Sequence, residues 1–354
     1  MKKIIFTGGG TAGHVTPNLA LIDRLDPKEW EIHYIGTANS IEQQLVSSRK
    51  RVIYHSIAAG KLRRYFSLKN FTDPFRVLKG LSQAKKLVKS INPDVVFSKG
   101  GFVSVPVVMA AKKHCPVIVH ESDYTPGLAN RIASKYADYI CVTFSDTEQY
   151  FDADKVTHTG SPIRDELFHG SARKALEFTG LSGKKPVLLV MGGSLGAQAI
   201  NEVVRKSLPE LLNRCDVIHI CGEGKLDTAC EREGYKQYAY ISEQLHDLLA
   251  LADMIVSRAG SNSIFEFLAL KKPAMLIPLP ASVSRGDQVL NARYFETRGY
   301  SARLDQEGLT SDKFLEVLEQ VFRSRDAYIE KMEGERFANG TEPILKIIYE
   351  VTGK

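Results

Sequence analysis

The sequence predicts an α/β protein made of two doubly wound domains with parallel sheets. Its 354 residues are about twice the length of a typical single domain, and 44% of them are hydrophobic, which is enough for two buried cores. Short runs rich in β-branched residues alternate with helical stretches along the whole chain, as in parallel sheets covered by helices. A glycine-rich loop recurs near the start of each half. This composition excludes a disordered or low-complexity protein.

Each expected strand is a short run dominated by apolar residues. In the first half we expect strands at Lys3–Thr7, Glu31–Gly36, Val52–Ile57, Asp94–Ser98, Pro116–His120, Tyr139–Thr143 and Lys155–Thr159. In the second half we expect them at Pro186–Met191, Val217–Cys221, Tyr238–Ile241, Met254–Ser257 and Ala274–Pro278. Helices are expected to connect successive strands.

The domain boundary is expected at Gly160-Ser161-Pro162-Ile163-Arg164, because glycine and proline end the last strand of the first half. The sequence therefore predicts an N-terminal domain over residues 1–160 and a second domain over residues 161–335. Residues 336–354 are expected to form a C-terminal helix that returns towards the first domain.

The two halves repeat one feature, a strand that ends in a glycine loop and leads into a helix. With an offset of 183 residues, Gly9, Gly10, Thr11 and Gly13 align with Gly192, Gly193, Ser194 and Gly196. Such a loop lets the backbone approach a ligand and directs its amides, with the helix N-terminus, towards an anion. The alternative for either loop is a tight strand-to-helix turn with no ligand.

Two nucleotide-binding classes are excluded by the residues around the first loop. Gly8-x-Gly10-x-x-Gly13 fits the dinucleotide pattern, but the second strand ends at Ile35-Gly36-Thr37 without the acid that would hold a ribose. His14 and Val15 follow Gly13 where a P-loop requires Lys and Ser or Thr. We therefore expect neither nicotinamide binding nor a P-loop ATPase.

Metal, disulfide and membrane-spanning features are not expected. The five cysteines form no C-x-x-C pair and are interpreted as reduced, buried thiols. Asp152-Ala153-Asp154 is interpreted as a surface turn rather than a metal site. No apolar run reaches the length of a membrane span, and the apolar part of the N-terminus is too short for a signal peptide, so we expect a cytoplasmic location.

Positive charge is concentrated in residues 61–89, which hold nine basic residues and one acid, a net charge of +8 against +6 for the whole chain. From Pro74 a helical pattern of apolar residues begins, and Tyr65, Phe66 and Phe71 lie just upstream. Aromatic and basic residues together suit an anionic membrane surface. The alternative is an amphipathic helix packed on the first sheet with a solvated basic face, and both can hold. No nucleic-acid motif accompanies the charge, so nucleic-acid binding is not expected.

Six motifs in one order are more specific. They are Gly8-Gly9-Gly10-Thr11-Ala12-Gly13-His14-Val15-Thr16-Pro17, His120-Glu121-Ser122-Asp123, Gly160-Ser161-Pro162-Ile163-Arg164, Gly192-Gly193-Ser194-Leu195-Gly196-Ala197, Ser257-Arg258-Ala259-Gly260 through Glu266, and Asp287-Gln288-x-x-Asn291-Ala292. From Met1 to about Arg336 the chain resembles the MurG family of peripheral membrane transferases. These add N-acetylglucosamine (GlcNAc) from UDP-GlcNAc to lipid I, undecaprenyl-diphospho-MurNAc-pentapeptide, to give lipid II. The resemblance implies the GT-B fold, two Rossmann-like domains that face each other across a cleft.

The resemblance also implies a role for particular residues. In the second half, the backbone of Ile241 would contact uracil, Glu266 the ribose hydroxyls and Gln288 the sugar hydroxyls. The diphosphate would be bound by Ser194, Ser261, Asn262 and Ser263. The donor pocket would be completed by Thr11, Ala12, Gly13, Asp123 and Arg164. Asp123 and Leu195 stand where some relatives have Asn and Gln. Arg258 is either a diphosphate clamp or an ion-pair brace.

Inverting transfer to a sugar hydroxyl requires a base, and the candidates are His14 and Glu121. His14 is favoured because histidine titrates near neutrality. Helix N-termini, loop amides and Arg164 would stabilise the departing UDP, so no metal or cofactor is expected. The implied partners are UDP-GlcNAc, lipid I, the anionic cytoplasmic surface of the cell membrane and cell-wall synthesis proteins. Alternatives are transfer to another lipid, such as a diacylglycerol, and a non-catalytic nucleotide-sugar-binding protein.

Overall fold

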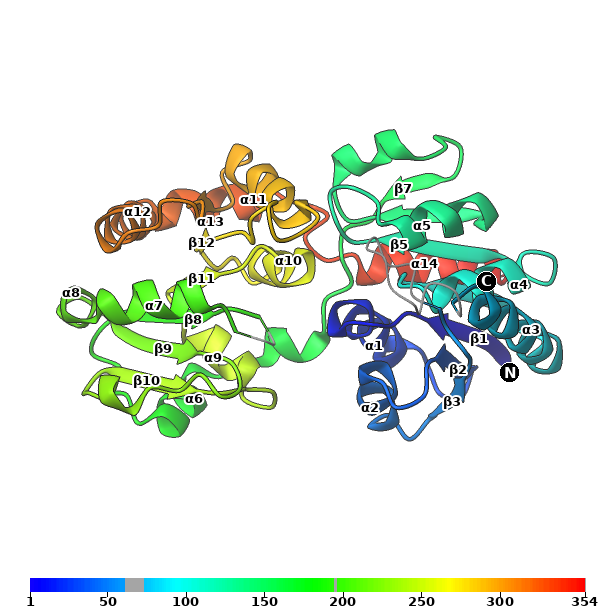
Figure 1. The fold of residues 1–354 in the computed structure, drawn as a ribbon, viewed down its shortest axis with the longest axis horizontal. Coiled ribbons are helices and arrows are strands. Elements are labelled where there is room, and N and C mark those ends of the chain that lie inside the picture. Colours follow the sequence, from blue (N-terminus) through cyan, green and yellow to red (C-terminus); the bar gives the residue numbers. More distant parts are fainter. Residues whose placement is uncertain (61–72, 194–195, 354) are drawn as a thin grey trace. The chain divides into compact units, whose positions relative to one another are not determined.

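The computed structural model describes residues 1–60, 73–193 and 196–353, and they form two compact units. Unit 1 comprises Met1–Arg164 together with Asn339–Lys354, and unit 2 comprises Asp165–Ala338. Each unit is a parallel sheet covered by helices (Figure 1). The expected α/β fold with two doubly wound domains is therefore confirmed.

The described residues of unit 1 form a seven-stranded parallel sheet in the order β3-β2-β1-β4-β5-β6-β7. Its strands are β1 (Lys2–Thr7), β2 (Trp30–Gly36), β3 (Val52–Ser56), β4 (Val95–Ser98), β5 (Val117–Glu121), β6 (Tyr139–Val142) and β7 (Val156–His158). From β1 the chain first adds β2 and β3 on one side and then β4 to β7 on the other, so the strand order reverses between β1 and β4. In such sheets ligands bind beyond the carboxyl ends of the strands at the reversal point.

Helices cover both faces of this sheet: α1 (Thr16–Arg24), α2 (Ile41–Ser47), α3 (Asp73–Ile91), α4 (Ser104–Ala111), α5 (Leu128–Ala133) and α14 (Thr341–Val351). One core joins α1, α2 and α14 to β1, β2 and β4, and the other joins α3 and α4 to the opposite face. The last helix of the chain therefore belongs to the first sheet, and Figure 1 shows it in red among the blue and cyan elements.

Helix α3 carries the described part of the basic segment. Gly80, Ala84, Val88 and Ile91 form its buried side, whereas Arg76, Lys79, Lys85, Lys86 and Lys89 are exposed. Leu78, which the apolar pattern included, is 64% exposed, so this residue does not join the core. Residues 61–72 lie outside the described part of the chain, and with them the aromatic residues Tyr65, Phe66 and Phe71.

In unit 2 the described residues form a six-stranded parallel sheet in the order β10-β9-β8-β11-β12-β13. Its strands are β8 (Val187–Met191), β9 (Asp216–Ile220), β10 (Tyr235–Tyr238), β11 (Met254–Ser257), β12 (Ala274–Leu276) and β13 (Ala302–Arg303). The order reverses beside β8, the counterpart of β1. Its helices are α6 (Ala172–Thr179), α7 (Gln198–Lys206), α8 (Leu208–Leu212), α9 (Leu245–Leu251), α10 (Ser261–Ala269), α11 (Asp287–Thr297), α12 (Ser311–Arg323) and α13 (Arg325–Glu333).

In unit 2 the position of one expected strand was wrong, and one further strand was not expected. Strand β10 ends at Tyr238, where the expected strand began, because it starts directly after a left-handed turn at Gly234 and pairs Tyr235 with Val217. Ile241 therefore follows this strand rather than ending it. Strand β13 was not expected, because two residues are too few for a periodic pattern.

Among the described helices, none is both long and apolar enough to cross a lipid bilayer.

Candidate functional site

The first glycine loop lies at the carboxyl end of β1, where the strand order of unit 1 reverses. After Thr7 the chain passes through Gly8, Gly9 and Gly10, makes a 3₁₀ turn at Ala12–His14 and enters α1. A Cβ atom on Gly9 would lie 2.6 Å from a carboxylate oxygen of Glu42, so this position has no room for a side chain. Thr11 is exposed, and Ala12 and Gly13 are partly exposed. The loop is thus packed on its inner side and open at Thr11.

His14 is held by the loop that carries it. Its Nδ1 atom lies 2.9 Å from the carbonyl oxygen of Gly9 and 3.3 Å from the hydroxyl of Thr11. A carbonyl can only accept a hydrogen bond, so Nδ1 carries the hydrogen, and a neutral ring then has its lone pair on Nε2. The geometry therefore selects the tautomer in which Nε2 can take up a proton.

Glu42, in the first turn of α2, is a buried carboxylate that the sequence did not single out. One oxygen accepts from the amide of Gly10 at 3.3 Å, and the other accepts from the amide and the hydroxyl of Thr37 at 3.1 and 2.5 Å. Burial raises its pKa, but these hydrogen bonds outweigh burial and leave the pKa below the usual value. Glu42 is therefore a charged group beneath the glycine loop.

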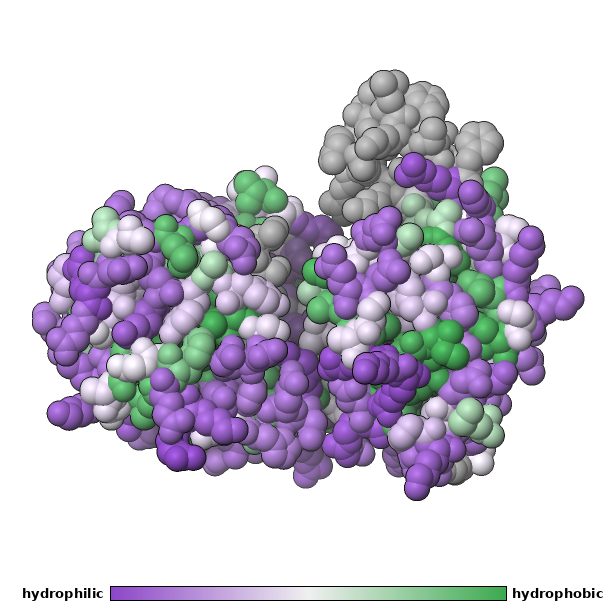
Figure 2. Space-filling view, turned by 90° about the horizontal axis from the view of Figure 1, so that it is seen from below, coloured by the Kyte–Doolittle hydropathy of each residue, from purple (hydrophilic) through white to green (hydrophobic). Residues whose placement is uncertain are grey.

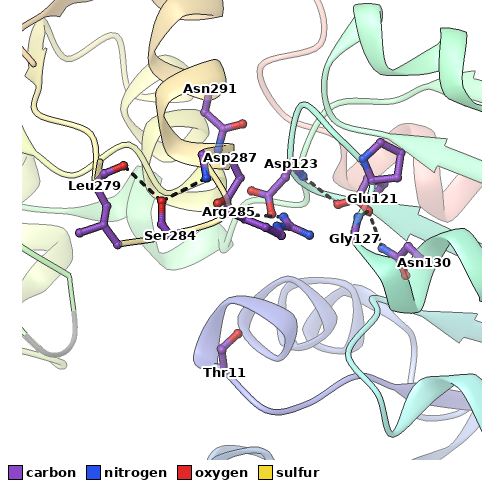
Figure 3. A network of polar contacts seen from close by, with 12 residues as sticks. Thr11, Glu121, Asp123, Gly127, Asn130, Leu279, Ser284, Arg285, Asp287 and Asn291 are labelled. Atoms are coloured by element: carbon purple, nitrogen blue, oxygen red, sulfur yellow. Dashed lines mark hydrogen bonds and ion pairs between the residues drawn. The ribbon is translucent and has the colours of Figure 1, made fainter. Parts of the chain in front are cut away.

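Glu121, the second candidate base, lies at the end of β5 and is 4% exposed. Its two oxygens accept from the amides of Asp123 (2.9 Å) and Gly127 (3.0 Å) and from the side chain of Asn130 (3.0 Å), as Figure 3 shows. Burial and the nearby charge of Asp123 raise its pKa. The carboxylate closes the loop between β5 and α5, and Asp123 itself is partly exposed on that loop.

Lys99, directly after β4, was also missed. Its side chain is fully buried, and Nζ lies 2.6 Å from Nδ1 of His120 and contacts the hydroxyl of Ser122. Nε2 of His120 lies 3.0 Å from the carbonyl of Gly160, so it carries the hydrogen and Nδ1 accepts from the lysine. Burial lowers the pKa of Lys99 to about 7, although Glu121 and Asp123 act in the opposite direction. The signal in the sequence was a lone charged residue between a buried strand and Gly100-Gly101.

The second glycine loop follows β8, where the strand order of unit 2 reverses. Ser194 and Leu195 lie outside the described residues, so the structure gives no position for this predicted diphosphate ligand. Around them, Gly193 has a φ of 82°, and the amide of Gly196 donates to its carbonyl at 2.9 Å. A Cβ on Gly196 would lie 1.9 Å from the carbonyl oxygen of Cys221, so only glycine fits there.

The predicted donor residues Ser261, Asn262 and Ser263 form the first turn of α10, which begins directly after the loop that follows β11. Glu266 lies one turn later and is 8% exposed. Arg258 in that loop donates to the carbonyls of Ile277 and Pro278 and to the side chain of Gln306. It braces the loop with hydrogen bonds to neutral groups, which differs from the ion-pair brace considered from the sequence.

The remaining predicted residues are spread over other loops of their units. Gln288, in the first turn of α11, accepts from the amide of Leu279 at 3.0 Å. In the loop between them, Ser284 donates to the carbonyl of Leu279 (Figure 3). Its hydroxyl also accepts from the amide of Gly286. Ile241 is 9% exposed in the segment after β10, and Arg164 is partly exposed at the end of unit 1.

Within residues 1–60, 73–193 and 196–353, no group of three or more His, Cys, Asp or Glu side chains is arranged to hold a metal ion. Asp152 accepts from the amide of Asp154 in an exposed turn. The five cysteines are free thiols, three of them buried.

Comparisons with known proteins agree along the whole chain. Residues 4–142 match the glycosyltransferase family 28 N-terminal domain, and residues 187–344 match its C-terminal domain. The chain is 52% identical over 353 residues to a protein of Lachnoclostridium phytofermentans named UDP-N-acetylglucosamine–N-acetylmuramyl-(pentapeptide) pyrophosphoryl-undecaprenol N-acetylglucosamine transferase, with 99% of each chain covered. A protein of Clostridium tetani with the same name is 49% identical, covering 98% of this chain and 97% of the relative.

Among solved structures, MurG of Acinetobacter baumannii matches with a TM-score of 0.76 at 24% identity, covering 99% of this chain and 100% of that one. This likeness supports the fold, and the two full-length relatives carry the closer assignment. Both halves of the chain match domains of one glycosyltransferase family, in the order in which that family has them. The chain belongs to glycosyltransferase family 28 and, within it, to the MurG family.

Proposed function

We propose that this protein is an inverting glycosyltransferase that moves GlcNAc from UDP-GlcNAc to the 4-hydroxyl of MurNAc in lipid I and so forms lipid II of the peptidoglycan pathway. The observation that carries the proposal is the identity of about half of all residues, over the full length, with relatives named for this reaction. The two glycine loops, each at the strand-order reversal of its sheet, support nucleotide-sugar chemistry.

For the donor, we assign the binding groups to unit 2 and to the loops of unit 1. We assign the diphosphate to Ser194 and to the first turn of α10 (Ser261, Asn262 and Ser263), where the N-terminus of a nine-residue helix favours negative charge. Glu266 accepts from the ribose hydroxyls, Gln288 binds sugar hydroxyls, and the backbone of Ile241 binds uracil. The donor pocket is completed by Thr11, Ala12, Gly13, Asp123 and Arg164.

His14 is the group to which we assign the base. Its neutral ring donates from Nδ1 to Gly9 and so has its lone pair on Nε2, which takes the proton of the acceptor hydroxyl as the oxygen attacks the anomeric carbon. Both oxygens of Glu121 are instead held by N–H groups of Asp123, Gly127 and Asn130, which favours a structural role for that carboxylate. As the bond to UDP breaks, loop amides, helix N-termini and Arg164 stabilise the charge on its diphosphate.

The test is UDP release on incubation of the protein with UDP-GlcNAc and lipid I. We expect UDP and lipid II in equal amounts. If UDP were released with a diacylglycerol and not with lipid I, the acceptor would be a diacylglycerol. If UDP-GlcNAc were bound but no UDP released in either mixture, the protein would be a non-catalytic binding protein. Each outcome leaves the family assignment unchanged and decides the reaction.

We also propose that unit 1 docks on the anionic cytoplasmic surface of the cell membrane, where a lipid-linked acceptor resides. Arg76, Lys79, Lys85, Lys86 and Lys89 are all exposed on α3, as is Leu78. Figure 2 shows hydrophobic groups among hydrophilic side chains on the surface of both units. Each cation near an anionic leaflet contributes about 1 kcal/mol, so five make a substantial, salt-sensitive attraction.

Sedimentation with vesicles tests this docking. Vesicles containing phosphatidylglycerol should bind the protein in low salt, and the double variant Lys79→Glu, Lys86→Glu should bind them at least about tenfold more weakly. A matched control, Lys313→Glu with Lys331→Glu, makes the same charge change at exposed positions of unit 2 and should bind normally. Equal loss in both pairs would assign the effect to net charge and contradict the proposed surface.

A further inference from the structure

Glu42 and His14 are both hydrogen-bonded to the peptide group between Gly9 and Gly10. The amide of Gly10 donates to the carboxylate of Glu42, and the carbonyl of Gly9 accepts from Nδ1 of His14. These two groups, the Gly9 carbonyl and the Gly10 amide, belong to the same planar peptide unit. A continuous chain of hydrogen bonds therefore runs from a buried carboxylate through one peptide group to the imidazole.

We propose that Glu42 is a positioning residue that acts on His14 through the Gly9–Gly10 peptide, fixing the tautomer of the ring and making Nε2 a stronger base. The inference rests on the proposed function, in which His14 takes the acceptor proton. A carboxylate that accepts from an amide draws the peptide electrons towards the carbonyl, which then accepts more strongly from the imidazole. In serine hydrolases a carboxylate that is hydrogen-bonded directly to the histidine orients the ring and stabilises the imidazolium. In this protein a peptide group lies between the carboxylate and the ring.

Packing makes this arrangement specific to Glu42. The residue is fully buried, and a Cβ on Gly9 would lie 2.6 Å from its Oε1 atom, so the loop can close on the carboxylate only because position 9 is glycine. Thr37 holds this same oxygen through two donors, and Oε2 accepts from the amide of Gly10. The carboxylate therefore stays charged and keeps one orientation, as a group that polarises a neighbouring peptide must.

Other ionisable groups border the same loop and must be separated from Glu42. The stem of Lys99 approaches Gly8, where a Cβ would lie 3.3 Å from that of the lysine. The hydroxyl of Tyr34 donates to the carbonyl of Gly8 at 2.8 Å. Both remain unchanged in the variants below, so any difference between those variants belongs to Glu42.

The experiment follows the ring NMR signals of His14 against pH in the free protein, with the signals assigned by comparison with His14→Ala. In Glu42→Gln the charge is lost, and an amide cannot accept from both Gly10 and Thr37. We expect the midpoint of the His14 titration to fall by at least about 0.3 pH unit, the size of a modest cooperative effect on a charged hydrogen bond.

Two control variants distinguish the proposal from a general loosening of the loop. Thr37→Val removes one donor but keeps the carboxylate, so the midpoint should stay the same or rise. Glu31→Gln makes the same chemical change beside another histidine, His33, and should leave the His14 midpoint where it is. An unchanged midpoint in folded Glu42→Gln, or an equal fall in Thr37→Val, would overturn the proposal.

A second measurement needs no substitution at Glu42. In the unmodified protein the amide signal of Gly10 should titrate with the same midpoint as His14, and independence of the two would also contradict the link. The pH dependence of kcat/KM then separates this inference from the proposed function. If the NMR midpoint moves in Glu42→Gln but the pH–rate profile does not, His14 is not the base, although the hydrogen-bonded chain is real.

Discussion

His14 is the side chain whose removal should affect turnover most. We expect His14→Ala to lower kcat by about 10²- to 10⁴-fold, the usual contribution of a general base. UDP binding, measured by calorimetry, should change little if the residue acts on the acceptor. The exposed His114 offers a matched control, and His114→Ala should keep normal turnover. Near-normal turnover of His14→Ala with unchanged pH dependence would remove the residue from this role.

Lys99 links one buried amine to the pH dependence of stability. Its pKa is about 7 in the folded protein, so between about pH 7 and 10.5 the unfolded chain binds a proton that the folded protein does not, and stability rises with pH across that window. Relative to Lys99→Met, the native protein should gain up to about 5 kcal/mol from pH 7 to 10.5.

The measurement is urea unfolding followed by the fluorescence of Trp30, the only tryptophan of the chain, which is buried in unit 1. Subtracting the free energy of unfolding of Lys99→Met from that of the native protein at each pH removes the contributions of other titrating groups. Lys28→Met makes the same substitution at an exposed position and serves as the matched control. A flat difference between the native protein and Lys99→Met would contradict the lowered pKa.

At the scale of secondary-structure elements, the turn between β8 and α7 depends on a glycine without space beside it. Gly196→Ala would place Cβ 1.9 Å from the carbonyl of Cys221 at a φ of 66°. Gly224→Ala imposes nearly the same backbone strain, at a φ of 69°, but has nothing within 4 Å.

We expect Gly224→Ala to cost about 1–2 kcal/mol and Gly196→Ala about 1–3 kcal/mol more, because only the second also overpacks. Denaturant unfolding gives both values, and UDP affinity should fall in Gly196→Ala. Equal costs in the two variants would show that the close approach to Cys221 does not matter.

The elements also separate what the sequence could predict from what it could not. Central strands such as β4 and β5 are buried on both faces, so their continuous apolar runs were recognisable, and the glycine loops follow from the need for close approach. Strand β13 is too short to show any periodic pattern. Strand β10 begins three residues earlier than expected, directly after the turn at Gly234. The partners of the buried charges Glu42 and Lys99 come from distant segments, so the sequence could not show what holds them, although Lys99 stands out as a lone charge before Gly100-Gly101.

At the scale of the whole molecule, α14 contributes Ile344, Leu345 and Ile348 to the core beside β1 and β2. Truncation of a buried isoleucine costs about 2–5 kcal/mol, so Ile348→Ala should destabilise unit 1 by that amount. Its neighbour Ile347 is only partly buried, and Ile347→Ala should cost clearly less. Hydrogen exchange assigns the loss to a unit: amides of β1 and β2 should exchange faster, and those of β8 and β9 at the native rate. Faster exchange in both sheets would contradict this division.

The place of α14 in unit 1 has a consequence for biosynthesis. All of unit 2, residues 165–338, is translated before α14. The strands of unit 1 are translated first, but one face of their sheet is covered fully only when residues 341–351 have been added. Domains usually mature in the order of their synthesis, and here the nascent chain completes the later one first. Until residues 341–351 are translated, the apolar surface that Ile344, Leu345 and Ile348 cover in unit 1 stays exposed.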